Sequence, residues 1–146
     1  MKHVLFAAML SVLVVSSGFA KDVKEVNKAV INTFKTDFKR AADVNWKITE
    51  KYVKASFMYN NAKMEAFYTL TGERIGTSRS IDLEELPAKA KRSFAKKFSN
   101  YTVTEAIEFE GVEDTSYFIS AENENESLIL QIDSTNSISV FKRTKK

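Results

Sequence analysis

Two strands and the turn between them can be recognised in residues 53–70, VKASFMYNNAKMEAFYTL. Apolar and polar residues alternate from Val53 to Tyr59 and again from Met64 onward, which is typical of strands that bury one face. Asn60-Asn61 separates the two runs, and asparagine tolerates the left-handed backbone of a tight turn. The segment therefore predicts an antiparallel hairpin within a larger sheet.

The flanking segments extend this pattern in both directions. Before the hairpin, a one-sided apolar stripe at helical spacing runs over residues 23–41, and alternation at residues 44–48 predicts a strand. After it we expect a strand at residues 74–81, a turn at 82–86, and a second helix with Pro87 at its first position. Four more strands are expected at residues 101–109, 115–121, 127–132 and 138–141. The predicted fold class is α+β, with the helices packed on one face of an antiparallel sheet.

The two halves of the chain share this order of elements. Phe34-x-x-x-Phe38, near the end of the first predicted helix, corresponds to Phe94-x-x-x-Phe98 near the end of the second. We therefore expect two tandem repeats, each a helix followed by antiparallel strands, at about residues 22–81 and 82–143. Together they would form one domain over residues 21–146 with a shared, extended sheet.

The first 20 residues are typical of an export signal. Lys2 and His3 precede an apolar run over residues 4–15, and Gly18 and Ala20 suit the small-residue positions of a cleavage site. A transmembrane helix needs ~20 apolar residues, more than this run provides. We predict a signal peptide at residues 1–20 and an exported product, periplasmic or secreted, without a transmembrane segment.

The composition excludes several kinds of chemistry. The sequence has no cysteine, and its one histidine, His3, lies within the predicted signal. Disulfides, thiolate nucleophiles and histidine general bases are therefore absent from the expected mature protein. Ser93-Phe94-Ala95-Lys96 fits a Ser-x-x-Lys motif, but the Ser-Asp-Asn and Lys-Thr-Gly elements that accompany it in serine acyl-enzymes do not occur. We predict no catalytic residues, no cofactor and no resident metal.

Short motifs along the chain resemble a known family. They are Val44-x-Trp46, Tyr52-x-x-x-x-Phe57, Ala66-x-Tyr68-x-x-x-Gly72 and Leu86-Pro87. These motifs look like the bacterial PepSY-like domains, which are also described as beta-lactamase-inhibitor-like. The resemblance covers about residues 24–142. It implies an exported envelope protein with helices on antiparallel sheet and no established enzymatic activity, and it assigns no inhibitory residue in this chain.

Charge is unevenly distributed behind a formal net charge of +3. Nine acidic residues and no basic ones lie between Phe98 and Phe141, and residues 142–146 are almost entirely basic. The segment Glu122-Asn123-Glu124-Asn125-Glu126 could offer oxygen ligands to Ca²⁺, although it lacks the glycine turn and the spacing of a calcium loop. Export and the acidic second half argue against a nucleic-acid partner.

The sheet itself offers a candidate binding surface. Alternation places Tyr52, Met58, Phe67 and Phe118 on the face opposite the helices, which a two-layer domain leaves open to water. We predict these four as partner-binding residues of a non-catalytic envelope protein that recognises a protein or peptide, inhibition of an enzyme being one form of this. The alternatives are a small-ligand or calcium carrier that uses the acidic second half, and a hydrolase that uses carboxylates alone.

Overall fold

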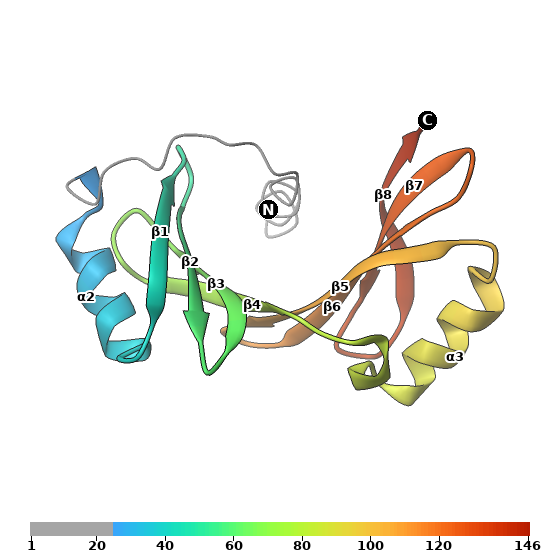
Figure 1. Ribbon diagram of the computed structural model, residues 1–146, viewed down its shortest axis with the longest axis horizontal. Coiled ribbons are helices and arrows are strands. Elements are labelled where there is room, and N and C mark those ends of the chain that lie inside the picture. The colour runs from blue at the N-terminus through green and yellow to red at the C-terminus, as the bar shows by residue number, and fades with distance from the viewer. Residues whose placement is uncertain (1–24) are drawn as a thin grey trace.

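A computed structural model describes residues 25–146. They form a single bent β-sheet on which two α-helices pack (Figure 1). The sheet has eight antiparallel strands that follow one another in chain order. They are β1 (Ala42–Ile48), β2 (Val53–Tyr59), β3 (Ala62–Tyr68), β4 (Arg74–Ser80), β5 (Thr102–Gly111), β6 (Thr115–Glu122), β7 (Glu126–Ile132) and β8 (Ile138–Lys145). Helix α2 (Lys28–Asp37) precedes β1, and the short 3-10 helix η2 (Leu83–Glu85) and α3 (Ala88–Lys97) connect β4 to β5. The predicted α+β class is confirmed.

Local sequence explains where these elements begin and end. Asn60 and Asn61 have φ angles of 50° and 63°, so the β2–β3 hairpin turns where the sequence predicts. The side chain of Asn27 accepts a hydrogen bond from the Ala29 backbone N–H at 2.9 Å and caps α2. The signal peptide predicted at residues 1–20 lies outside the described residues. Within residues 25–146, no helix is long and apolar enough to cross a membrane.

Several predicted boundaries differ from the observed ones. The first helix covers only Lys28–Asp37 of the apolar stripe at residues 23–41. Two further differences concern Pro87 and the last strand. Pro87 is the N-cap of α3 and does not occupy its first position, because its backbone is extended (ψ 137°) while its carbonyl accepts the first helical hydrogen bond from Lys91 N–H. Strand β8 does not end at Phe141 but continues to Lys145. The basic end of the chain is held there by pairing with β7, in which Arg143 lies opposite Leu128.

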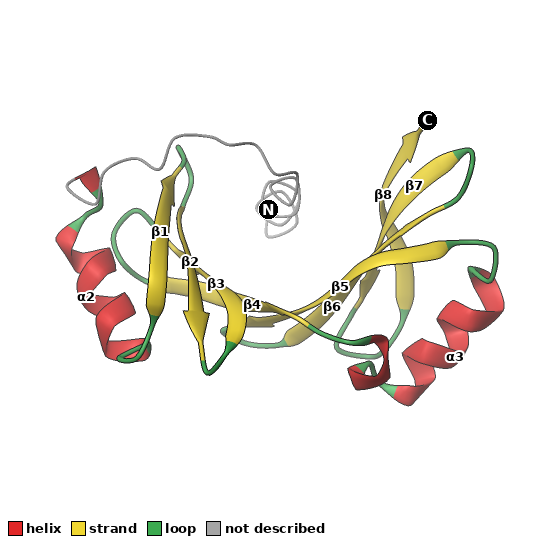
Figure 2. Cartoon of the chain, in the orientation of Figure 1, coloured by secondary structure: helices red, strands yellow, loops and turns green. Residues whose placement is uncertain are grey.

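Strand register places both helices on the same face of the sheet. Neighbouring residues Trp46, Ala55, Ala66 and Thr77 run across β1 to β4, and Ala106, Ile119 and Leu130 run across β5 to β7. Thr77 pairs with Glu110, which is four residues from Ala106 on β5, so the two rows share one face. Helix α2 packs on the first row and α3 on the second. We call this side the helix face and the other the inner face, because the helices lie outside the bend (Figure 2).

Each helix covers a separate apolar core. Under α2, the ring of Phe34 meets Trp46 and Phe57 edge-on, at centroid distances of 5.1 Å and 4.9 Å. Under α3, Ala90 packs with Ile119 and Leu130, all of them fully buried. Trp46, Phe57 and Tyr68 are core residues, as alternation predicts.

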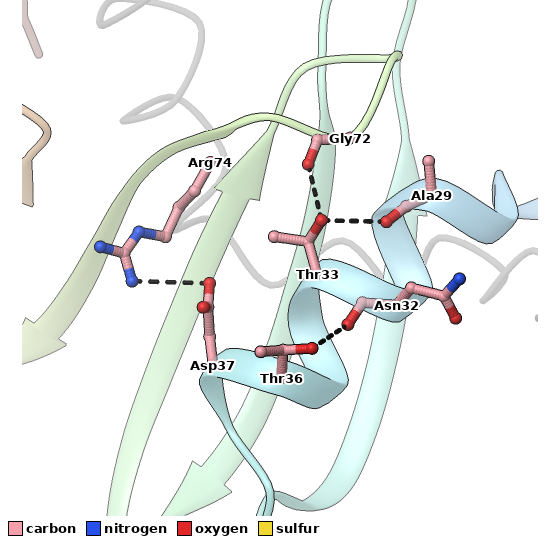
Figure 3. Close-up of polar contacts among 7 residues, drawn as sticks. All are labelled: Ala29, Asn32, Thr33, Thr36, Asp37, Gly72 and Arg74. Atoms are coloured by element: carbon pink, nitrogen blue, oxygen red, sulfur yellow. Dashed lines mark hydrogen bonds and ion pairs between the residues drawn. The ribbon is translucent and has the colours of Figure 1, made fainter.

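Polar contacts tie α2 to the loop between β3 and β4 (Figure 3). The Thr33 hydroxyl lies 2.9 Å from the Gly72 carbonyl oxygen, and Arg74 pairs with Asp37 at 3.5 Å. Gly72 has φ +103°, and a Cβ there would lie 2.9 Å from the backbone carbon of Ala29. Only glycine permits this close approach, which positions the helix above β2 and β3.

The Tyr68 hydroxyl is buried beneath α2 without a hydrogen-bond partner among residues 25–146. An unpaired buried hydroxyl is costly, so Tyr68→Phe is expected to raise the free energy of unfolding by about 1 kcal/mol. Equilibrium denaturation measures this, with Tyr59→Phe as a control for losing a half-buried tyrosine hydroxyl. Equal or lower stability of Tyr68→Phe would show that the hydroxyl is satisfied in solution.

The same residue makes stability sensitive to alkaline pH. Burial, and secondarily the charge of Asp37, raises the pKa of Tyr68 above its ordinary value of 10. The folded state therefore holds this proton more tightly than the unfolded state. Below pH 10 both states keep the proton, so the free energy of unfolding does not depend on it. As pH rises above 10, the unfolded state loses the proton first and the free energy of unfolding falls by about 1.4 kcal/mol per pH unit. The stability advantage of Tyr68→Phe should widen over that range.

Candidate partner-binding face

Register locates all four predicted binding residues on the inner face. Phe67 lies opposite Lys54, and Lys54 points to the same face as Tyr52 and Met58 because alternate residues of a strand share a face. Phe118 lies opposite Ile107 of β5, which points to the inner face because it follows Ala106 of the helix face. The structure brings Tyr52, Phe67 and Phe118 into one apolar cluster with Phe109. Met58 lies outside this cluster and lines a neighbouring pocket. The inner face thus has an aromatic part and a pocket.

The aromatic part is packed and not open to solvent. Tyr52, Phe67 and Phe118 are only 2%, 2% and 1% exposed, which corrects the expectation that water covers them. The rings of Tyr52 and Phe67 are 5.9 Å apart, and those of Phe67 and Phe109 are 6.0 Å apart. Half-buried residues pack around them, namely Ile75, Ile107, Ile129 and Phe141. These contacts give the three residues a packing role, and their role in binding stays a prediction.

Gly76 allows the aromatic part to lie flat on the sheet. It sits on β4 opposite Phe67, and a Cβ there would lie 2.5 Å from Cζ of Phe109 and 2.7 Å from the carbonyl oxygen of Glu110. The phenyl ring thus crosses the strand where a side chain is missing. Sequence reasoning missed this pair, although a glycine inside a predicted strand signals such an approach.

A partly buried ion pair lies beside the aromatic cluster. Lys54 is 6% exposed, and its Nζ is 2.5 Å from Oε1 of Glu65 on the neighbouring strand. The Ser56 hydroxyl donates to the same carboxylate oxygen at 3.3 Å. The pair compensates a charge that burial would otherwise make very unfavourable. It gives the floor of the inner face a fixed polar group between its apolar residues.

A pocket of about 570 Å³ opens next to this ion pair. Met58 and Ile107 supply apolar walls, and Lys63, Glu65 and Glu105 supply charges. Its full lining is Asp43, Asn45, Ser56, Phe57, Met58, Lys63, Met64, Glu65, Ser78, Arg79, Ser80, Glu105 and Ile107. Partial burial, and then the nearby charge of Glu65, raises the pKa of Glu105. Such a mixture of apolar walls and fixed polar groups suits a protruding side chain of another molecule.

The acidic loop proposed for calcium has other bonding partners. Glu122 pairs with Lys146 at 3.1 Å, and Glu126 pairs with Arg143 at 3.4 Å and accepts a hydrogen bond from the Tyr101 hydroxyl. The Asn123 side chain accepts hydrogen bonds from two backbone N–H groups of the turn. Within residues 25–146, no three histidine or acidic side chains are grouped so that they could hold a metal ion. The loop is therefore organised as a turn that holds the end of β8.

Comparison with known proteins gives matches only among solved structures. No family model matches the sequence, and neither does any curated protein. A BLIP-like protein from Bacteroides fragilis is 14% identical, with a TM-score of 0.68 over 82% of this chain and 85% of that one. A protein of Bacteroides eggerthii whose name assigns it to the periplasm is 20% identical, with a TM-score of 0.72 over 88% and 90%.

A third structure gives the same result. A DUF2874 family protein from Bacteroides uniformis is 14% identical, with a TM-score of 0.72 over 82% of this chain and 88% of that one. At these identities the likeness is one of fold. The chain therefore has the fold of BLIP-like and DUF2874 proteins, which is the fold that its resemblance to the PepSY-like, beta-lactamase-inhibitor-like domains predicts.

Proposed function

We propose that this chain is a non-catalytic, exported binding protein of the bacterial envelope that recognises a protein or peptide with its inner face. The observation that carries the proposal is the pocket between Met58 and Ile107, on the side of the sheet that neither α2 nor α3 covers. A sheet face with apolar and charged groups side by side has the composition of a recognition surface.

The proposed site combines accessible contact residues with a packed aromatic cluster next to them. Met58 and Lys63 are half-buried and exposed, respectively, so a partner can touch them directly. Tyr52, Phe67 and Phe118 form a packed aromatic cluster beside the pocket on the same face. Binding surfaces with little freedom lose little entropy when a partner docks, so a rigid cluster beside the pocket favours affinity.

Export is supported by two independent observations. The first 20 residues have the pattern of a signal peptide. The Bacteroides eggerthii protein with the same fold has a name that assigns it to the periplasm. Inhibition of an exported enzyme is one form that binding could take, and it rests on the name of the BLIP-like neighbour alone.

The two-repeat organisation is part of the same proposal. In each half, one helix precedes four strands and covers its own apolar core. The third cluster joins the halves, because Tyr52 and Phe67 come from the first and Phe109 and Phe118 from the second. Duplication of a helix-plus-sheet unit explains how one continuous inner face arises from two separate cores.

Recovery of partners from a bacterial envelope extract tests the proposal. Met58→Asp and Lys63→Glu change the pocket, and Lys96→Glu makes a matched charge change at an exposed position on α3. The immobilised wild type and Lys96→Glu should retain the same protein, quantified by mass spectrometry, and the two pocket variants should retain at least tenfold less. Equal recovery by all four proteins, or no specific protein on the wild type, would contradict the proposal.

A further inference from the structure

Strand β1 forms one edge of the sheet. Within residues 25–146, it pairs only with β2. Thr49 N–H donates to the Tyr52 carbonyl oxygen at 2.9 Å, and in an antiparallel ladder the hydrogen-bonding groups of successive residues alternate in direction. The backbone N–H and C=O groups of Trp46 and Ile48 therefore point away from β2. They are positioned to pair with another extended chain.

An apolar groove of about 580 Å³ lies beside this edge, between β1 and α2. Val44 and Trp46 form its strand side, and Ile31, Phe34 and Phe38 form most of its helix side. The strand residues belong to the helix face, since both contribute to the core under α2. In a strand added along β1, every second side chain would point to that face and enter the groove.

The groove also has an uncompensated positive rim. Lys35 and Lys39 line it and are exposed, and neither forms an ion pair within residues 25–146. The one acidic residue between them, Asp37, is paired with Arg74 of β4. Acidic side chains of an added strand would therefore find partners here.

The same charges argue against a second copy of this chain as the occupant. The other edge strand, β8, carries Lys142, Arg143 and Lys145, so joining the two edges would bring like charges together. The pairing length is also limited, because β1 has a bulge between Ala42 and Asn45 and Asp43 has φ 54°. Regular pairing is therefore confined to the last few residues of the strand.

We propose that the β1 edge binds a short, extended acidic segment of another protein as a ninth strand. Main-chain hydrogen bonds would join it to Trp46 and Ile48, an apolar side chain would enter the groove, and carboxylates on either side of it would meet Lys35 and Lys39. This surface is separate from the pocket at Met58, so the two proposals can fail independently.

The probe is the peptide acetyl-Thr-Glu-Thr-Ile-Thr-Glu-Thr-amide, in which both glutamates and the isoleucine share one face of a strand. It is titrated into the ¹⁵N-labelled protein while amide chemical shifts are recorded. We expect the largest shifts at Trp46 and Ile48. The double variant Lys35→Gln/Lys39→Gln should bind at least fivefold more weakly, and Lys47→Gln, an exposed change on the same strand, should bind as the wild type does.

Altered peptides separate strand addition from simple charge attraction. Each of two peptides is methylated at every second backbone nitrogen. The peptide methylated at the N–H groups that face β1 should not bind, and the peptide methylated at the N–H groups that face away from β1 should bind as the unmethylated one does. A peptide with lysine in place of glutamate should not bind. The proposal is overturned if the β1 amides do not shift, if the lysine peptide binds equally well, or if both methylated forms bind. Shifts centred on Met58 and Lys63 would also overturn it and would place the peptide at the pocket instead.

Discussion

Gly76→Ala is expected to lower the free energy of unfolding by about 3 kcal/mol, at the upper end of what overpacking a core residue costs. The new Cβ would meet the Phe109 ring at 2.5 Å and the Glu110 carbonyl oxygen at 2.7 Å. The ring is held by Phe67, and the carbonyl belongs to a strand that pairs with β4, so neither can move cheaply. The loss is measured by equilibrium denaturation.

The opposing glycine provides a matched control. Gly111 pairs directly with Gly76, but a Cβ there would come no closer than 3.2 Å to Asp114 O, so Gly111→Ala should cost much less. Phe109→Leu should relieve part of the Gly76→Ala loss, giving a double variant more stable than the sum of the single losses predicts. Equal costs at the two glycines would contradict the close packing of Phe109 on Gly76.

Glu65→Ala is expected to destabilise the fold by about 3–5 kcal/mol, because it leaves the buried ammonium of Lys54 without its counter-charge. Replacing both partners, as in Lys54→Met/Glu65→Leu, should restore stability to near the wild-type level, since apolar residues of similar size remove the need for compensation. A double-mutant cycle by denaturation measures the coupling.

An exposed ion pair serves as the reference for this cycle. Lys91 Nζ and Glu84 Oε2 lie 2.9 Å apart, but Glu84 is 90% exposed, so Glu84→Ala should change stability little. If Glu65→Ala cost no more than Glu84→Ala, Lys54 would have to reach water in solution. The floor of the inner face would then be less rigid than the structure indicates.

The hairpin at residues 53–70 was predictable because two local signals agree. Alternation fixed the faces of β2 and β3, and the asparagine turn fixed their register, in which Val53 lies opposite Tyr68. The end of β8 was not predictable in this way. Its basic residues resemble a solvated tail, and pairing with β7 holds them in the sheet.

The candidate site was predictable only in part. Alternation put the four candidates on one face, but the burial of Tyr52, Phe67 and Phe118 depends on rings brought together from different strands. The pocket likewise requires side chains from β1 to β5, which are far apart in sequence. Lys54 and Glu65 are an exception, since the predicted hairpin register already places them on adjacent strands and the same face.

Photo-crosslinking from the inner face tests the proposed function most directly. Benzoylphenylalanine is incorporated at Met58, or at exposed Lys96 on α3 as the control, and the protein is irradiated in the bacterial envelope. A partner that docks on the inner face will give one predominant covalent adduct from position 58 and none from position 96. The absence of any adduct at position 58, or the same adduct at both positions, would contradict recognition by this face.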